Sequence, residues 1–207
     1  MSALQNRRER EIVEMRQLIV DAAIKLFIEE GYEKVSIRSI AQRIQYAPGT
    51  IYLYFKDRDA LFFAMHEWAF KKLMVVFETN LRDINNPIEK LRAMSATYVN
   101  FSFKNPELYD LMFILQEPMC AEENAENWAC GLAVFKILQD IIDESFEQNL
   151  LKGDSAPMIS FMFWSSLHGM VSLHLRNRLR MYDGLDLESL IQHTSETLLN
   201  QFLIVSE

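Results

Sequence analysis

Glycine, proline and cysteine are scarce in this 207-residue chain, which contains 6 Gly, 5 Pro and 2 Cys. So few turn-forming residues leave little material for the tight turns of a sheet protein, and the composition therefore favours long helices. The two cysteines, Cys120 and Cys130, cannot build a disulfide framework, and they are either ordinary thiols or a redox-responsive pair. Half of the residues are apolar, which is enough to bury a sizeable core.

Long apolar runs are also missing. No stretch approaches the roughly 20 apolar residues needed to cross a bilayer, and the first segment, MSALQNRREREIVEMR, is charged where a secretory signal would be apolar. We therefore expect a soluble, cytoplasmic protein. No phosphate-binding glycine loop, metal-ligand spacing or Ser-His-Asp pattern is found, so we expect neither an enzyme nor a cofactor or metal site.

The charge of the chain is unevenly distributed. Residues 1–58 carry 10 Lys and Arg against 8 Asp and Glu, a balance of +2, whereas residues 59–207 carry 11 against 21, a balance of −10. The two balances add up to the net charge of −8. This distribution is expected if only the N-terminal part approaches a polyanion such as DNA.

Apolar residues recur at spacings of three and four along most of the chain, which predicts amphipathic helices. Ser36, Asp57, Asn86 and Asp186 are the expected N-terminal caps of four of them. Nine helices and no convincing strand predict an all-α fold. The expected helices cover 10–30, 37–44, 48–55, 57–81, segments that begin at 87 and 106, and 123–151, 157–181 and 187–204.

The stretch TIYLYF, residues 50–55, has the aromatic and β-branched composition of a strand. A strand would need a partner, and the sequence offers no second run of that kind. Pro48 instead suits the first position of a helix, where its missing N–H costs nothing. In that helix Ile51 and Phe55 share an inner face. With the preceding helix and a three-residue turn, the segment forms a helix-turn-helix in which Ile40, Ile44 and Ile51 pack together.

Two stretches of this region, GYEKVSIRSIAQRI and APGTIYLYFKDRDAL, resemble the TetR-type transcriptional regulators. That family typically shows a Gly-aromatic step, Ser or Thr, Ile-Ala, and then Gly-Thr-[Leu/Ile]-Tyr-x-[Tyr/His]-Phe-x-x-[Lys/Arg]-x-x-Leu. The resemblance covers residues 10–61, and WSSLHG, residues 164–169, is similar to a motif in one branch of the family. Gln45 and Tyr46 depart from it, because the family usually has glycine and a small aliphatic residue there. A non-glycine residue with positive φ at position 45 costs about 1 kcal/mol.

The resemblance implies a helix-turn-helix DNA-binding domain at residues 1–57 and a helical ligand-binding and dimerisation domain at 58–207. It implies a homodimeric regulator that binds palindromic operator DNA and is released by a small, largely apolar effector; a repressor is the expected kind, and an activator stays open as the alternative. The groove chemistry of the exposed side chains defines the expected DNA contacts, with Arg38 as the reader of guanine and Lys56 as a phosphate contact. The expected DNA-binding residues are Ser36, Arg38, Tyr46, Ala47, Pro48, Gly49, Thr50, Tyr52, Tyr54 and Lys56.

The rest of the chain is rich in aromatic residues and methionine, which can line an effector cavity between helices or simply fill the core. The expected ligand-binding residues are Tyr98, Phe101, Met112, Phe113, Trp128, Phe135, Phe161, Trp164 and His168. The last two helices would form the dimer interface, although the same residues can also fill the core of the protomer. The expected interface residues are Leu167, Val171, Leu175, Leu190, Ile191, Leu198 and Phe202.

An alternative from another class remains open. The aromatic residues of an all-α enzyme or adaptor could line the same cavity, with the N-terminal helices as a protein-docking module. Such a protein would show no salt-dependent binding to duplex DNA, whereas the affinity of a DNA-binding regulator falls steeply as salt rises.

Overall fold

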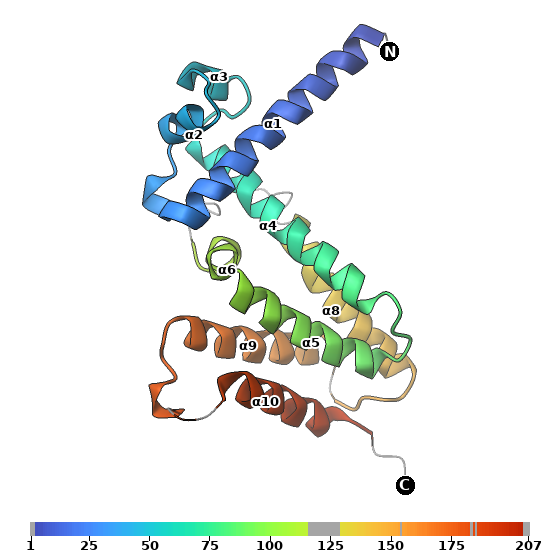
Figure 1. The fold of residues 1–207 in the computed structure, drawn as a ribbon. Helices are drawn as coiled ribbons and strands as arrows, with labels where there is room; N and C mark the ends of the chain where they lie inside the picture. The colour runs from blue at the N-terminus through green and yellow to red at the C-terminus, as the bar shows by residue number, and fades with distance from the viewer. Residues whose placement is uncertain (1–2, 116–128, 154, 183, 185, 205–207) are drawn as a thin grey trace. The chain divides into compact units, whose positions relative to one another are not determined.

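The structure, a computed structural model, describes residues 3–115, 129–153, 155–182, 184 and 186–204. Within these ranges the chain is helical and forms no β-sheet, apart from one antiparallel bridge between Leu151 and Leu203 (Figure 1). The predicted all-α class is confirmed. The α-helices are α1 (Ala3–Glu30), α2 (Ile37–Arg43), α3 (Pro48–Tyr52), α4 (Arg58–Leu81), α5 (Pro87–Lys104), α6 (Pro106–Phe113), α8 (Ala129–Glu147), α9 (Ala156–Leu175) and α10 (Leu187–Phe202).

Helices α4 and α5 begin where the sequence predicted, because local side chains satisfy their first N–H groups. Asp57 Oδ1 accepts a hydrogen bond from the Ala60 N–H at 2.8 Å. Asn86 Oδ1 accepts from the N–H groups of Ile88 and Glu89 at 2.9 and 3.1 Å, and Pro87 occupies the first turn of α5. The predicted N-caps of α4 and α5 are thus confirmed.

Several helix ends differ from the expected ones. Helix α1 begins at Ala3 instead of Arg10, and α3 ends at Tyr52 instead of Phe55. Helix α9 ends at Leu175, six residues before the expected end at Met181, because Asn177 turns into the left-handed region at φ 53°. A short 3₁₀ helix, η3 (Arg180–Tyr182), follows. Asn149, at φ 56°, ends α8 in the same way.

Contacts between Cα atoms divide the chain into two compact units, and the division falls within α4. Unit 1 comprises Met1–Phe70 and Glu107–Trp128, and unit 2 comprises Lys71–Pro106 and Ala129–Glu207. In unit 1, α2 packs against both α1 and α3. In unit 2, α5 packs against α8, α9 and α10, and α9 packs against both α8 and α10. The functional boundary after residue 57 stays a prediction.

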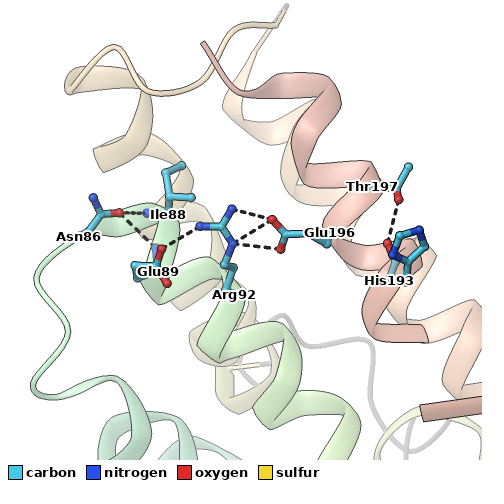
Figure 2. A network of polar contacts seen from close by, with 7 residues as sticks. All are labelled: Asn86, Ile88, Glu89, Arg92, His193, Glu196 and Thr197. Carbon is cyan, nitrogen blue, oxygen red and sulfur yellow. Dashed lines mark hydrogen bonds and ion pairs between the residues drawn. The ribbon is translucent and has the colours of Figure 1, made fainter. Parts of the chain in front are cut away.

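Charged side chains fasten the helices of unit 2 to one another. Arg92 of α5 donates to both carboxylate oxygens of Glu196 of α10 at 2.6–3.0 Å and to Glu89 at 2.8 Å (Figure 2). Lys90 binds Glu144 of α8 at 2.9 Å. The Arg92 guanidinium lowers the pKa of Glu196, chiefly through these hydrogen bonds. Bidentate pairs of this kind fix geometry as well as charge, so α5 holds α10 in a defined register.

In the described part of the chain, no helix combines the length and the apolar character that a bilayer crossing requires.

Candidate functional site

The turn between α2 and α3 has the geometry that the sequence predicted for a helix-turn-helix. Ser36 caps α2, and its Oγ accepts from the Ser39 N–H at 3.1 Å while Ser39 Oγ accepts from the Ser36 N–H at 3.0 Å. Gln45 lies at φ 61°, so the predicted left-handed residue is present without glycine. Pro48 occupies the first turn of α3. The two helices are therefore joined by Ile44 to Ala47 in a fixed bend.

Buried apolar side chains hold α3 against its neighbours. Ile40 and Ala41 of α2 and Ile51 of α3 are fully buried, and Phe55 is nearly so. Because α2 and α3 are short, they have little intrinsic stability, and this packing is what keeps them helical. The opposite face of α3 is consequently turned outward.

The outward surface carries the residues that were predicted to bind DNA. Thr50 and Tyr54 are half-buried, whereas the side chain of Lys56 is 82% exposed and Tyr52 is 56% exposed. A Cβ at Gly49 would meet no atom within 4 Å, so packing does not require glycine at this position. The missing side chain leaves the outer surface of α3 flat there. The predicted residues that are exposed are Ser36, Arg38, Tyr46, Ala47, Pro48, Gly49, Tyr52 and Lys56.

Arginines that do not lie on this outward surface hold unit 1 together. The Arg58 guanidinium lies over the rings of Tyr32 and Phe62, at 4.5 and 4.8 Å from their centroids, and donates to the carbonyls of Val35 and Tyr32 at 3.2 and 3.3 Å. Arg43 forms an ion pair with Glu29 of α1. The sequence pattern marked position 58 as basic but did not reveal the contacts of Arg58 with Tyr32 and Val35, which lie more than twenty positions away in the chain.

Five of the predicted ligand-binding residues, on α5, α8 and α9 of unit 2, are linked by ring or hydrogen-bond contacts, and the outermost of them, Phe161, is exposed. The Tyr98 hydroxyl lies 3.1 Å from His168 Nδ1. The ring of Trp164 lies 5.4 Å from that of His168, 6.2 Å from that of Phe135 and 6.4 Å from that of Phe161. Burial lowers the pKa of His168, which favours a neutral imidazole. We call Tyr98, Phe135, Phe161, Trp164 and His168 the aromatic cluster.

The other predicted ligand-binding residues are placed elsewhere. Met112 and Phe113 belong to unit 1, where the Phe113 ring lies 5.4 Å from that of Phe70. Phe101 is buried in α5, and Trp128 lies outside the described residues, as does Cys120.

The predicted interface residues divide into two groups. Leu167, Val171 and Ile191 are buried inside the protomer. They therefore fill its core, which the sequence had left open as the alternative to a role in the interface. Leu175, Leu190, Leu198 and Phe202 are half-buried. The apolar residues that are exposed on α9 are Met158, Phe161, Met162, Trp164 and Leu173, and of these the sequence had offered only Phe161 and Trp164 as possible interface residues.

A groove of about 250 Å³ between α5 and α10 was not expected from the sequence. The residues that line it include the buried Leu91, Phe163 and Leu199 and also Arg92 and Glu196, whose ion pair is drawn in Figure 2. The periodicity of α5 and α10 places polar residues on their outer faces, but the groove depends on how the two helices are spaced. Only the structure reveals that spacing.

His66 is the clearest source of pH dependence in unit 1. Its Nε2–H donates to the Met112 carbonyl at 3.3 Å, and burial lowers the pKa of the ring. The His66 ring of the unfolded chain therefore takes up a proton near the ordinary pKa of 6.5, whereas the ring of the folded chain takes it up only at lower pH. Stability is full above that pH and falls as the pH drops below it, by at most about 1.4 kcal/mol per pH unit for one proton.

We accordingly expect the free energy of unfolding to fall between pH 7 and pH 5, and we expect His66→Gln to reduce that slope. Glutamine keeps a donor for the carbonyl but does not titrate. Urea unfolding at several pH values measures both slopes, and His193→Gln, at an exposed position of α10, is the matched control. An unchanged slope in His66→Gln would contradict this account.

Comparison with known proteins agrees with the helix-turn-helix and the all-α architecture. Residues 19–65 match the family described as "Bacterial regulatory proteins, tetR family", and residues 91–198 match "Tetracyclin repressor-like, C-terminal domain". The second match covers more than half of the chain. The fold and the site thus define a helix-turn-helix protein of the regulator class. The chain belongs to the TetR family.

Individual relatives resemble the chain over more limited parts. An HTH-type transcriptional repressor of Mycobacterium tuberculosis is 44% identical over 50 residues, which are 24% of this chain and 27% of that protein. The chain spans between 20% and 54% of the lengths of the curated relatives that it matches.

Solved structures match over most of their length. A Rhodococcus protein of unknown function has a TM-score of 0.79 at 20% identity, with coverage of 91% of this chain and 95% of that one. FadR of Bacillus subtilis, solved in complex with stearoyl-CoA, has a TM-score of 0.67 at 20% identity, covering 88% and 96%. At these identities the similarity shows the fold alone.

Proposed function

We propose that this protein is a transcriptional regulator that binds palindromic operator DNA as a homodimer through α3. The observation that carries the proposal is the division of α3 into two faces. Ile51 is fully buried, while Gly49, Tyr52 and the following Lys56 are exposed, and Arg38 is exposed on the adjoining α2. A short helix presented in this way fits the major groove, with its N-terminal residues toward the base edges.

The proposed dimer forms through the outer face of α9, together with the half-buried leucines of α10. Met158, Phe161 and Met162 are exposed on that face, and Ser165, Gly169 and Ser172 follow at helical spacing. A Cβ at Gly169 would meet no atom within 4 Å. Apolar and small residues along one face allow two helices to approach closely. A dimer supplies two helix-turn-helix units, here called the reading heads, one for each half of a palindrome.

The proposed effector is small and largely apolar and binds at the aromatic cluster. The rings of the cluster offer apolar surface, and the Tyr98–His168 pair offers polar atoms within it. FadR, which shares the fold, was solved with a ligand that has a long acyl chain. Effector binding would lower operator affinity by changing the separation of the two reading heads.

A binding experiment tests the proposal. A random duplex library enriched by the wild-type protein yields a specific duplex, and fluorescence anisotropy measures its affinity at several salt concentrations. We expect the affinity to fall steeply as salt rises. A protein that enriches no duplex, or that binds without salt dependence, would contradict the proposed function.

Arg38→Ala and Lys56→Ala are expected to have different effects. Arginine reads guanine through a bidentate contact worth about 1–3 kcal/mol, so Arg38→Ala should relax the preference for the enriched duplex over a scrambled one. Lys56→Ala should weaken binding to both duplexes alike and lower the salt slope by about 1. The same titrations measure both effects, and equal losses of preference in the two variants would refute this division of roles.

A further inference from the structure

The C-terminal end of α3 needs support from outside the helix. Helix α3 has only five residues. After it, the N–H groups of Leu53 and Tyr54 fold back onto the carbonyls of Thr50 and Ile51 at 3.2 and 2.9 Å. The carbonyl of Tyr54 lies two residues beyond the end of α3 and belongs to the turn that follows the helix, where a backbone carbonyl needs a hydrogen-bond partner from outside the helix. A cationic donor placed there would satisfy that carbonyl and fix the turn that holds α3.

Arg16 of α1 occupies that position. Its Nη1 donates a hydrogen bond to the carbonyl of Tyr54, and its guanidinium carbon lies 4.2 Å from the centroid of the Phe55 ring. The ring is almost fully buried, so it gives the guanidinium a fixed surface to stack on. In the described part of the chain, no carboxylate forms an ion pair with Arg16.

From this contact we infer that Arg16 is a positioning residue that sets the tilt of α3 on α1 and so aims its outward face at the DNA bases. The inference rests on the proposed function. A hydrogen bond from a charged donor is stronger than one between neutral groups, and stacking on Phe55 limits the directions that the guanidinium can take. One side chain thus joins the long helix α1 to the turn that directly follows the short reading helix.

A direct phosphate contact by Arg16 would have a different signature. The guanidinium is already committed to the Tyr54 carbonyl and the Phe55 ring, and both lie beyond the C-terminal end of α3. A phosphate contact would weaken all DNA sequences alike and would lower the salt slope by about 0.9. A tilted reading helix instead loses base contacts, so it lowers the affinity for the preferred sequence selectively.

The test compares Arg16→Ala and Arg16→Lys with Arg10→Ala. Arg10→Ala is the matched control because it removes the same charge from an exposed position of α1, where the Nε of Arg10 donates to the Asn6 carbonyl of its own helix at 3.2 Å. The probes are a duplex enriched by the wild-type protein and a scrambled duplex of equal length. Anisotropy gives both affinities, and amide hydrogen exchange reports on Leu53, Tyr54 and Phe55.

We expect Arg16→Ala to bind the enriched duplex about tenfold more weakly, the loss expected for one charged hydrogen bond, and to bind the scrambled duplex as wild type does. Exchange at the three amides should become faster. Arg16→Lys, which keeps a charged donor but loses the planar stack, should give an intermediate affinity, and Arg10→Ala should match wild type. If Arg16→Ala does not fold, Arg16→Gln replaces it, with the same expected loss of preference.

Two results would overturn the role of Arg16 alone. One is an equal loss on both duplexes, which is the signature of a phosphate contact, and the other is unchanged affinity for the enriched duplex. A wild-type protein that enriches no duplex would instead overturn the proposed function, and the role of Arg16 with it.

Discussion

Phe161→Glu is expected to leave the chain folded, to make it monomeric, and to lower its affinity for a palindromic duplex by about 100-fold. Phe161 is 56% exposed on α9, so a carboxylate there remains hydrated in the protomer. In a dimer two such carboxylates would be buried face to face, which is strongly unfavourable. Without the dimer the two reading heads bind independently, and the avidity of a linked pair, about 10²-fold or more, is lost.

Val75→Glu is the matched control for this prediction. Val75 is 59% exposed on α4, and the substitution introduces the same charge at a position with almost the same exposure. We expect that variant to remain dimeric and to bind as wild type does. Analytical ultracentrifugation measures the assembly and anisotropy measures the affinity. A dimeric Phe161→Glu protein, or a monomer that keeps full operator affinity, would contradict the proposed interface.

Features set by local chemistry could be predicted from the sequence. Ser36 and Asn86 accept hydrogen bonds from N–H groups two or three residues away, so their roles can be read from a short window of sequence. Gln45 stands at the turn position where the resembled family usually has glycine, which predicts a positive φ, and it lies at φ 61°. The predicted helix starts and the helix-turn-helix follow from such local constraints.

Helix ends were harder to predict because the apolar pattern continued past them. Leu179 and Met181 extend the spacing of α9, yet the helix ends at Leu175 and Asn177 enters the left-handed region. Asparagine tolerates this conformation better than most residues, but it does not require it. Whether the chain turns there depends on contacts that the helix makes elsewhere.

The two faces of α9 could not be separated from the sequence. The helix is apolar around most of its circumference, so its periodicity does not distinguish the core from an interface. The structure buries Leu167 and Val171 inside the protomer and leaves Phe161 exposed. The contacts of Arg16 and Arg58 were hidden for a related reason. Each joins residues that are distant in the sequence, and no local pattern records the partner.

Ile51→Ala is expected to destabilise the helix-turn-helix by about 2–5 kcal/mol and to abolish specific DNA binding. Ile51 has no exposed surface, and removing its buried methyl groups costs both their transfer free energy and the cavity that they leave. Helices as short as α2 and α3 depend on such packing, so a loss of this size unfolds the reading head in a large fraction of molecules. Urea unfolding followed by circular dichroism measures the destabilisation.

Leu53→Ala supplies the contrast that makes the Ile51 result specific. Leu53 lies two residues further along the chain and is 79% exposed, so the same kind of truncation removes almost no buried surface. We expect its stability to stay within about 0.5 kcal/mol of wild type. Equal destabilisation by both variants would mean that the inward face of α3 has been assigned wrongly. Since the outward face of α3 is defined by the burial of Ile51, the DNA-binding surface would then have to be reassigned as well.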